Sequence, residues 1–356
     1  MHDCRNMSVS IIVPTIDSGG AEKQAVLLAV TLSRKYIVNL IVLSGIHSEY
    51  KLNTVLLNNS TVSVYKLKGS TFKKICNIVS IFKKTNTTII FNYLTLPDII
   101  GSICGKVCGA RVYNGIRSTV LGKEKEIFEK IVHNLIASGT IFNSYSAKEV
   151  FCRKGFSFNK SLVIPNCYPN IEDYIQRKEE SLKTIITVGR FDPSKDYCTL
   201  LKSISLLDRS DYRLCIVGYG VLENQIRDWV KEYGIEDKTD IHIKPDNVSE
   251  LERNADIYLS TSLYEGTSNS IMEALNWSLP IVATDVGDNN HLVINGENGF
   301  LHPIGDVSGL AESLCRLLDS VDLRNKMGLK SNQILRENYS MEIFEKRYID
   351  LIEQRI

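Results

Sequence analysis

The sequence predicts an α/β protein made of two doubly wound domains, each with a parallel sheet covered by helices on both faces. Short runs rich in Val and Ile alternate with longer amphipathic stretches, and this alternation occurs in two successive series. Near-continuous apolar strands are typical of parallel sheets that are buried on both faces. Two such series within 356 residues fit two domains.

The predicted elements follow from this alternation. Strands of the first series are expected at 9–13, 38–43, 62–67, 88–92, 111–114, 140–143 and 161–164. Strands of the second series are expected at 184–188, 213–217, 240–243, 256–260, 280–284 and 299–302. Helices are expected at 21–35, 72–84, 197–207, 222–233 and 268–277.

The domain boundaries follow from the gap between the two series. The charged stretch 171–182 has neither periodicity and is expected to be a linker. We therefore expect an N-terminal Rossmann-like domain over 1–168 and a C-terminal one over 183–340. A last helix over 341–356 begins after Ser340, a suitable N-cap, and is expected to pack back on the N-terminal domain.

Composition excludes several classes of protein. Hydrophobic residues make up 44% and charged residues 23%, so a disordered or collagen-like chain is excluded. Nine cysteines without a C-x-x-C pair or zinc-ligand spacing fit small buried thiols in a reducing cytosol, with no metal site. We expect no secretory signal and no membrane-spanning segment, because no run reaches about 18 apolar residues.

The charges are distributed unevenly along the chain. The net charge of +1 suggests no nucleic-acid partner, but residues 1–165 hold 21 Lys and Arg against 9 Asp and Glu. The stretch 72–84 has apolar residues at helical spacing with lysines at both ends, namely Lys73, Lys74, Lys83 and Lys84. This pattern is compatible with a core-facing helix that has a solvated basic edge, and also with a helix that contacts an anionic membrane surface.

Two motifs place glycines at predicted strand-to-helix turns. Gly19 and Gly20 precede the first helix, and Gly218, Tyr219 and Gly220 follow a strand of the second series. Glycines let the backbone come close to a phosphate or a nucleoside. Each pattern is also compatible with an ordinary tight turn. Neither matches G-x-G-x-x-G, which argues against a dinucleotide site and a nicotinamide oxidoreductase.

A pair of cations lies at another strand end. Gly189 and Arg190 close the strand that begins the second series, and Lys195 lies five residues further on. Ligands of open parallel sheets bind beyond the carboxyl ends of the strands. An Arg and a Lys there suit a diphosphate, the first by bidentate bonding and the second as a point charge. Solvated ion pairs with Asp192 or Asp196 are the alternative.

Two glutamates flank a turn before a predicted helix. Glu265 precedes this turn and Glu273 lies in the helix, and the turn consists of Gly266, Thr267, Ser268 and Asn269. Amides at a helix start can bind a phosphate, and a carboxylate can accept bonds from two vicinal hydroxyls. The pattern therefore suits a ribose and a sugar, although by itself it also fits a helix with surface glutamates.

Together these motifs resemble the retaining glycosyltransferases of family 4, the bacterial surface-polysaccharide enzymes with the GT-B fold of two Rossmann-like domains facing across a cleft. In the second half the carriers are V-G-R at 188–190, K-D at 195–196, V-G-Y-G at 217–220 and the E-x(7)-E segment E-G-T-S-N-S-I-M-E-A at 265–274. In the first half, G-G-A-E at 19–22 and V-I-P-N at 163–166 fit the same family. The resemblance covers nearly the whole chain.

The resemblance implies a role for each motif. Arg190 and Lys195 would hold the diphosphate of a nucleotide-sugar, Glu273 its ribose, and Glu265 the transferred sugar. These roles would make Arg190, Lys195 and Glu265 catalytic. The remaining donor-binding residues would be Gly19, Gly20, Gly189, Gly218, Tyr219, Gly266, Thr267, Ser268 and Asn269. No cofactor or metal is implied, because the chain has no D-x-D motif.

The function implied by resemblance and charge is a retaining transfer from a nucleotide-sugar, which we expect to be UDP-linked, to a lipid-linked saccharide. The expected location is the cytoplasmic side of the cytoplasmic membrane, where the enzyme would be peripheral and serve lipopolysaccharide, O-antigen or capsule assembly. Two alternatives stay open. They are a GT-B sugar-nucleotide epimerase or hydrolase, and a non-catalytic glycosyltransferase-like assembly partner.

Two positions depart from the family pattern. Many relatives have a His after the fourth strand of the first domain, where this chain has Asn92 and Tyr93. Either side chain could replace the His as a hydrogen-bonding group. In the second half, His291 stands where relatives commonly have Glu. Both departures concern the choice of sugar.

Overall fold

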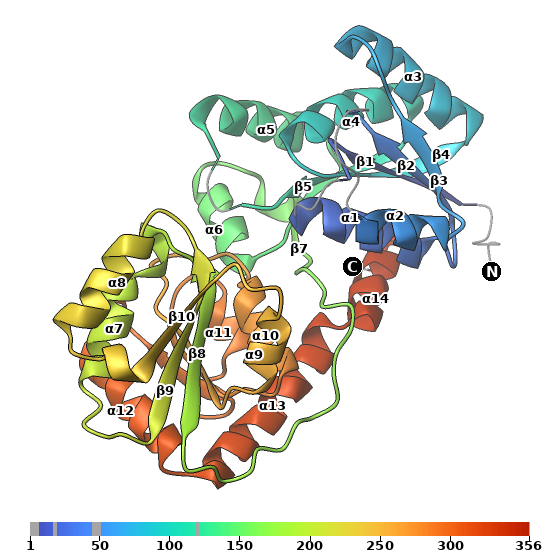
Figure 1. The fold of residues 1–356 in the computed structure, drawn as a ribbon. Helices are drawn as coiled ribbons and strands as arrows, with labels where there is room; N and C mark the ends of the chain where they lie inside the picture. The colour runs from blue at the N-terminus through green and yellow to red at the C-terminus, as the bar shows by residue number, and fades with distance from the viewer. Residues whose placement is uncertain (1–6, 17–19, 45–50, 119–120, 356) are drawn as a thin grey trace. The chain divides into compact units, whose positions relative to one another are not determined.

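The computed structural model describes residues 7–16, 20–44, 51–118 and 121–355 (Figure 1). The chain divides into two compact units, one formed by Met1–Pro169 with Met341–Ile356 and the other by Asn170–Ser340. Each unit contains one sheet, and the strand pairs in both sheets are parallel. The predicted fold class is confirmed.

The sheet of the first unit has the order β3-β2-β1-β4-β5-β6-β7. Its strands are β1 (Ser8–Val13), β2 (Ile37–Val42), β3 (Ser63–Lys66), β4 (Thr87–Asn92), β5 (Arg111–Ile116), β6 (Gly139–Phe142) and β7 (Ser161–Val163). Its helices are α1 (Gly20–Leu32), α2 (Lys51–Asn58), α3 (Thr71–Lys84), α4 (Thr95–Cys108), α5 (Lys123–Leu135), α6 (Tyr145–Arg153) and α14 (Met341–Ile352). Every residue of β1 is buried, including the two serines Ser8 and Ser10, as expected for a central strand of a parallel sheet that is covered on both faces.

The sheet of the second unit has the order β10-β9-β8-β11-β12-β13. Its strands are β8 (Lys183–Arg190), β9 (Tyr212–Tyr219), β10 (Thr239–Ile243), β11 (Ile257–Ser260), β12 (Ile281–Thr284) and β13 (Gly299–His302). Its helices are α7 (Tyr197–Ser205), α8 (Glu223–Glu232), α9 (Val248–Arg253), α10 (Asn269–Asn276), α11 (Asn289–Leu292), α12 (Val307–Leu318) and α13 (Val321–Tyr339). The central strands β8 and β11 place the chain segments that follow them side by side.

Apolar clusters stabilise the first unit on both faces of its sheet. Helices α1, α2 and α14 lie on one face, and α3, α4 and α5 lie on the other (Figure 1). The C-terminal helix α14 contributes Phe344 and Tyr348 to the cluster that also contains residues of α1 and β1. The opposite cluster includes Ile78 and Phe82 of α3. Within the described residues, no helix combines the length and the apolar character needed to cross a membrane.

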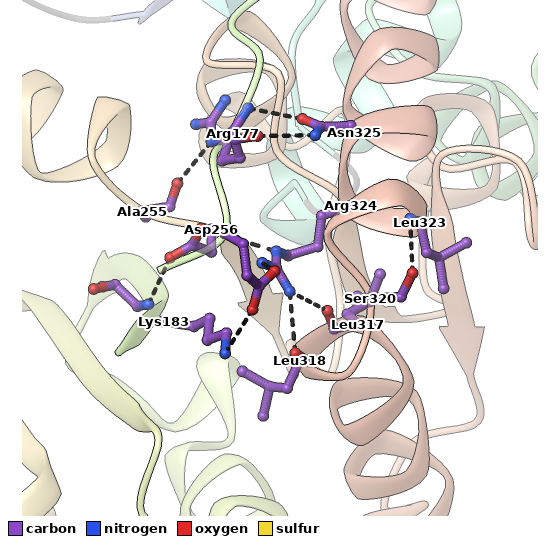
Figure 2. A network of polar contacts seen from close by, with 12 residues as sticks. Arg177, Lys183, Ala255, Asp256, Leu317, Leu318, Ser320, Leu323, Arg324 and Asn325 are labelled. Carbon is purple, nitrogen blue, oxygen red and sulfur yellow. Dashed lines mark hydrogen bonds and ion pairs between the residues drawn. The ribbon is translucent and has the colours of Figure 1, made fainter. Parts of the chain in front are cut away.

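The stretch 171–182 forms no helix or strand, yet it belongs to the second unit and is held there by buried polar contacts (Figure 2). Arg177 donates from Nε to the carbonyl oxygen of Ala255 at 3.1 Å, and its backbone exchanges two hydrogen bonds with the side chain of Asn325. Burial lowers the pKa of Arg177 to about 10, which still leaves it charged at neutral pH. The expected linker is therefore a fixed strap along the second unit.

Arg324 of α13 is the centre of the same network (Figure 2). Its side chain is fully buried, and Nη1 donates to the carbonyl oxygens of Leu317 and Leu318 at 2.7 and 3.1 Å. Its Nη2 pairs with Glu179 of the strap at 3.1 Å, and its Nε lies 3.9 Å from Asp256 Oδ1. The guanidinium thus joins the end of α12, the start of β11 and the strap.

The first unit contains a buried pair of carboxyl groups, Asp98 of α4 and Glu129 of α5, which are 0% and 1% exposed. Asp98 accepts a hydrogen bond from the amide of Gly115 at 2.9 Å, and the two side chains are hydrogen-bonded to each other. Two acceptor groups can bond in this way only through a proton that they share. Burial, opposed in part by the nearby charge of Arg117, raises the pKa of Asp98, and burial with the charge of Asp98 raises that of Glu129.

This pair predicts a pH dependence of the stability of the first unit. Both pKa values are raised, so the folded state binds more protons than the unfolded chain between about pH 5 and pH 8. Stability should therefore fall as the pH rises through this interval. In Glu129→Gln an amide N–H can donate to Asp98 without proton uptake, and we expect a flatter dependence.

The measurement is thermal unfolding followed by circular dichroism across that pH range. Both tryptophans, Trp229 and Trp277, lie in the second unit, so their fluorescence provides an internal control. Glu124→Gln, on the exposed side of the same helix, is the matched variant. An unchanged pH dependence in Glu129→Gln would contradict the shared proton.

Candidate functional site

The turn after β8 is built to present Lys195. Asp192 accepts a bond from the amide of Ser194 at 2.9 Å, which starts a short 3₁₀ turn over Pro193–Lys195. Asp196 then adopts a left-handed conformation with φ +46° and caps α7 by accepting from the amide of Thr199. The two aspartates thus hold the backbone that positions Lys195.

Lys195 and Glu265 form an ion pair across 70 residues of sequence, with Lys195 Nζ donating to Glu265 Oε1. The hydroxyl of Ser262 donates to the same oxygen at 2.8 Å. The two charged side chains are 21% and 14% exposed, so each keeps some access to solvent. The predicted diphosphate residue and the predicted sugar residue are thus brought into direct contact.

Arg190 ends β8, and its side chain is 74% exposed. It pairs loosely with Asp192, with 3.5 Å between Arg190 Nε and Asp192 Oδ2. A loose pair at the surface contributes little to stability. The guanidinium can therefore turn toward an anionic ligand at small energetic cost.

The glycines at the end of β9 are required by close packing. A Cβ atom on Gly218 would lie 1.9 Å from the carbonyl oxygen of Gly189, with which Gly218 is paired in the sheet. Gly220 has φ +154°, and its Cβ would lie 2.4 Å from the carbonyl oxygen of Phe191. Packing of the two strand ends accounts for both glycines. Between them Tyr219 is 49% exposed, with the ammonium of Lys244 4.4 Å from the centre of its ring.

The turn before α10 is anchored at both ends. Gly287 has φ +57°, and its Cβ would lie 2.2 Å from the carbonyl oxygen of Glu265. The carbonyl oxygen of Gly266 accepts a bond from the amide of Asp288 at 3.2 Å. Ser268 is the N-cap of α10 and accepts from the amide of Ile271. This segment therefore has a defined backbone.

Side-chain exposure divides the residues of this turn. Thr267 and Ser268 are buried, Gly266 and Glu273 are partly buried, and Asn269 is exposed. Of the side chains expected to meet the donor here, Glu273 and Asn269 reach the surface. Thr267 and Ser268 can reach a ligand through their backbone amides.

Glu252 of α9 is a buried acid that no sequence motif marks. It is 2% exposed, and burial together with the charge of Glu273 raises its pKa to about 8. Glu252 is therefore mostly protonated at neutral pH. Nothing in the local sequence distinguishes Glu252 from a surface glutamate of an amphipathic helix.

Comparison with known proteins identifies the second unit. Residues 171–333, nearly the whole of this unit, match the family model "Glycosyl transferases group 1". An α-1,4-N-acetyl-D-galactosaminyltransferase of Campylobacter jejuni, whose named acceptor is a PP-undecaprenol-linked saccharide, is 22% identical over 98% of this chain and 99% of its own length.

Solved structures match the arrangement of elements. The Anabaena protein HepE, in a complex with UDP, superposes with a TM-score of 0.80 at 16% identity, covering 98% of this chain and 100% of that one. The lipopolysaccharide outer core galactosyltransferase WaaB superposes with a TM-score of 0.78 at 17% identity and the same coverage. The chain is a glycosyltransferase with the GT-B fold.

The first unit of this glycosyltransferase contains the other predicted site residues. Gly20 begins α1 and is exposed, and a Cβ atom on it would meet nothing within 4 Å, while Gly19 lies outside the described residues. Lys73, Lys83 and Lys84 of α3 are exposed and Lys74 is partly buried. The inward side of α3 packs through apolar residues, as the core-facing interpretation requires.

Asn92 and Tyr93, the suggested substitutes for a His, are both 1% exposed. Asn92 donates to Asn114 Oδ1 at 2.9 Å, and the Tyr93 hydroxyl lies 3.3 Å from that of Tyr348 in α14. The guanidinium of Arg117 covers the Tyr93 ring at 4.4 Å. Both side chains are thus engaged inside the first unit. In the second unit His291 lies exposed in α11.

Proposed function

We propose that this glycosyltransferase is a retaining hexosyltransferase of family 4 that moves a sugar from a UDP-sugar to a lipid-linked saccharide. The observation that carries the proposal is the Lys195–Glu265 pair beside the exposed Arg190. The pair brings a cation and a carboxylate into contact beyond two adjacent strands, and Arg190 lies at the end of one of them, where parallel sheets bind ligands. Relatives support the choice of substrates, since the Campylobacter enzyme has a PP-undecaprenol-linked acceptor and HepE binds UDP.

The chemistry requires stabilisation of a departing nucleoside diphosphate. As the bond between the sugar and the phosphate breaks, negative charge develops on the diphosphate. Arg190 can bind it in a bidentate manner, and Lys195 can approach it as a point charge. Lys195 must then share its ammonium between the phosphate and Glu265. This leaves Glu265 oxygens available to hydroxyls of the transferred sugar.

A lipid-linked acceptor implies that the enzyme works at a membrane surface. We place the enzyme at the cytoplasmic side of the cytoplasmic membrane, as a peripheral protein in lipopolysaccharide, O-antigen or capsule assembly. The lysines of α3, namely Lys73, Lys74, Lys83 and Lys84, would contribute to attraction by an anionic surface, at about 1 kcal/mol for each cation near it. Incubation with donor alone and with donor plus lipid acceptor distinguishes a transferase from an epimerase or hydrolase.

The two glutamates provide the sharpest test of the donor site. Glu273 would bind the ribose, which does not change during reaction, so Glu273→Gln should weaken binding of UDP and of the donor. Glu265 would contact the sugar that is transferred, so Glu265→Gln should lower turnover and leave UDP affinity within about threefold of the wild type. Gln retains the shape and one acceptor oxygen of Glu.

UDP affinity is measured by calorimetry, and turnover at saturating donor. Glu297→Gln is the matched control, because that carboxylate is exposed and pairs with Lys330 away from the turn. Loss of UDP affinity in Glu265→Gln together with normal affinity in Glu273→Gln would overturn the assignment.

A further inference from the structure

The outer side of α4 and α5 carries large apolar side chains that are open to solvent. These helices cover one face of the first unit's sheet beside α3 (Figure 1). Their exposed apolar residues are Leu96, Ile103 and Val107 of α4, and Ile127, Phe128, Ile131 and Leu135 of α5. Val107 is 69%, Phe128 56% and Leu135 75% exposed. We call these seven residues the α4–α5 face.

The α4–α5 face is separate from the side of each helix that fills the core. Ile100 and Cys104 of α4 belong to the buried cluster of the first unit, and Val132 of α5 is buried. The exposed residues follow helical spacing, since 127, 131 and 135 are four apart and 103 and 107 are four apart. Each helix thus has a second apolar side. Because α4 packs against α5, the two outer sides are neighbours.

The charges around this face are largely positive. The same two helices carry Lys106, Lys123, Lys125 and Lys130, and the neighbouring helix α3 carries four more lysines. Of the four acids of α4 and α5, Asp98 and Glu129 are buried and Glu126 is paired with Lys154 at 2.5 Å, which leaves Glu124 as the exposed acid. Two copies of such a face would repel each other. An apolar surface bordered by cations suits an anionic lipid interface.

We propose that the α4–α5 face inserts into the interfacial region of an anionic bilayer, with the surrounding lysines at the level of the lipid phosphates. The purpose of this contact, access to a lipid-linked acceptor, rests on the function proposed above. The contact itself does not depend on that function. It predicts two separable contributions to binding. The lysines supply one that salt weakens, and the apolar side chains supply one that persists at high salt.

Sedimentation with vesicles of phosphatidylcholine and phosphatidylglycerol tests both contributions. The double change Ile127→Ser with Phe128→Ser should weaken binding about tenfold or more, in low and in high salt. Replacement of Lys73, Lys74, Lys83 and Lys84 by Gln should weaken binding at low salt and change little in about 0.5 M salt, where charges are screened.

The matched control is Val221→Ser with Ile304→Ser, since both side chains are exposed in the second unit. This variant should bind as the wild type does. Equal vesicle binding by the wild type and the Ile127/Phe128 variant would overturn the proposal. So would a wild-type dimer in lipid-free sedimentation that this variant abolishes, because the face would then be an interface between two copies.

A fluorescent reporter shows insertion directly. Phe128→Trp places an indole on the face, whereas the chain's own Trp229 and Trp277 lie in the second unit. Lipids brominated near the start of the acyl chains should quench the added emission, and Val221→Trp should show no such quenching. Absence of quenching for Phe128→Trp on bound vesicles would contradict insertion.

Sugar transfer to a water-soluble, short-chain acceptor separates this proposal from the proposed function. Variants of the face should retain that transfer while losing vesicle binding. A wild-type protein that binds and inserts in vesicles but transfers sugar to no acceptor would refute the proposed function and leave the lipid-binding face supported.

Discussion

Arg190→Ala and Lys195→Ala should each reduce sugar transfer by roughly ten- to a hundredfold or more, because each removes a charge-assisted bond to the leaving diphosphate worth about 1.5–3 kcal/mol. The effect of Lys195→Ala should be the larger of the two. It also leaves the Glu265 carboxylate beside the diphosphate without its cation. Initial rates with saturating acceptor, over a range of donor concentrations, measure both effects.

Lys202→Ala is the matched control for this prediction. Lys202 lies on α7, the helix that follows the Lys195 turn, and its side chain is exposed. The Lys202→Ala variant should transfer sugar at the wild-type rate. Wild-type rates in both Arg190→Ala and Lys195→Ala would show that the diphosphate is bound elsewhere.

Arg324→Ala should lower the free energy of unfolding of the second unit by about 3–5 kcal/mol. The change leaves the carbonyl oxygens of Leu317 and Leu318 without their donor and removes the cation beside Asp256 (Figure 2). Uncompensated buried groups are costly, because neither water nor another donor replaces the lost partner. Denaturant unfolding followed by tryptophan fluorescence measures this loss, since both tryptophans lie in the second unit.

Arg227→Ala provides the comparison, because Arg227 forms an exposed ion pair with Glu223 within α8. Such a pair contributes little, so this variant should unfold within about 0.5 kcal/mol of the wild type. Equal stabilities of the Arg324 and Arg227 variants would show that the buried network is dispensable.

Much of the architecture was predictable because periodicity reports burial locally. The Val- and Ile-rich stretch predicted as a strand at 9–13 is the central strand β1, which is buried along its whole length. The apolar spacing of 72–84 predicted a helix, which is α3, and its buried residues are Ile78 and Phe82, whereas Phe72 at its start is exposed. Where a pattern allowed two explanations, the structure was needed. Gly218 is required by the carbonyl oxygen of Gly189, a contact that only the pairing of β8 with β9 creates.

The parts of the site that lay beyond prediction depend on distant pairings. The sequence could place Lys195 and Glu265 at two strand ends, but the order β8-β11 in the sheet decides that they touch. The sequence of the strap 171–182 has no hydrophobic periodicity. Its conformation is fixed instead by single side-chain contacts to α13 and to the residues just before β11. Neither kind of contact leaves a periodic signal in the chain.

The sequence by itself determined the two-domain α/β fold, the cations at the end of β8 and the glutamates around the α10 turn, because these depend on local patterns of burial and turn chemistry. The tertiary structure decided which charges meet. It paired Lys195 with Glu265, enclosed Asp98 with Glu129, and left the α4–α5 face exposed. Hydrophobic periodicity predicts that a helix has an apolar side. Only the packing of neighbouring elements shows which apolar side stays exposed to solvent.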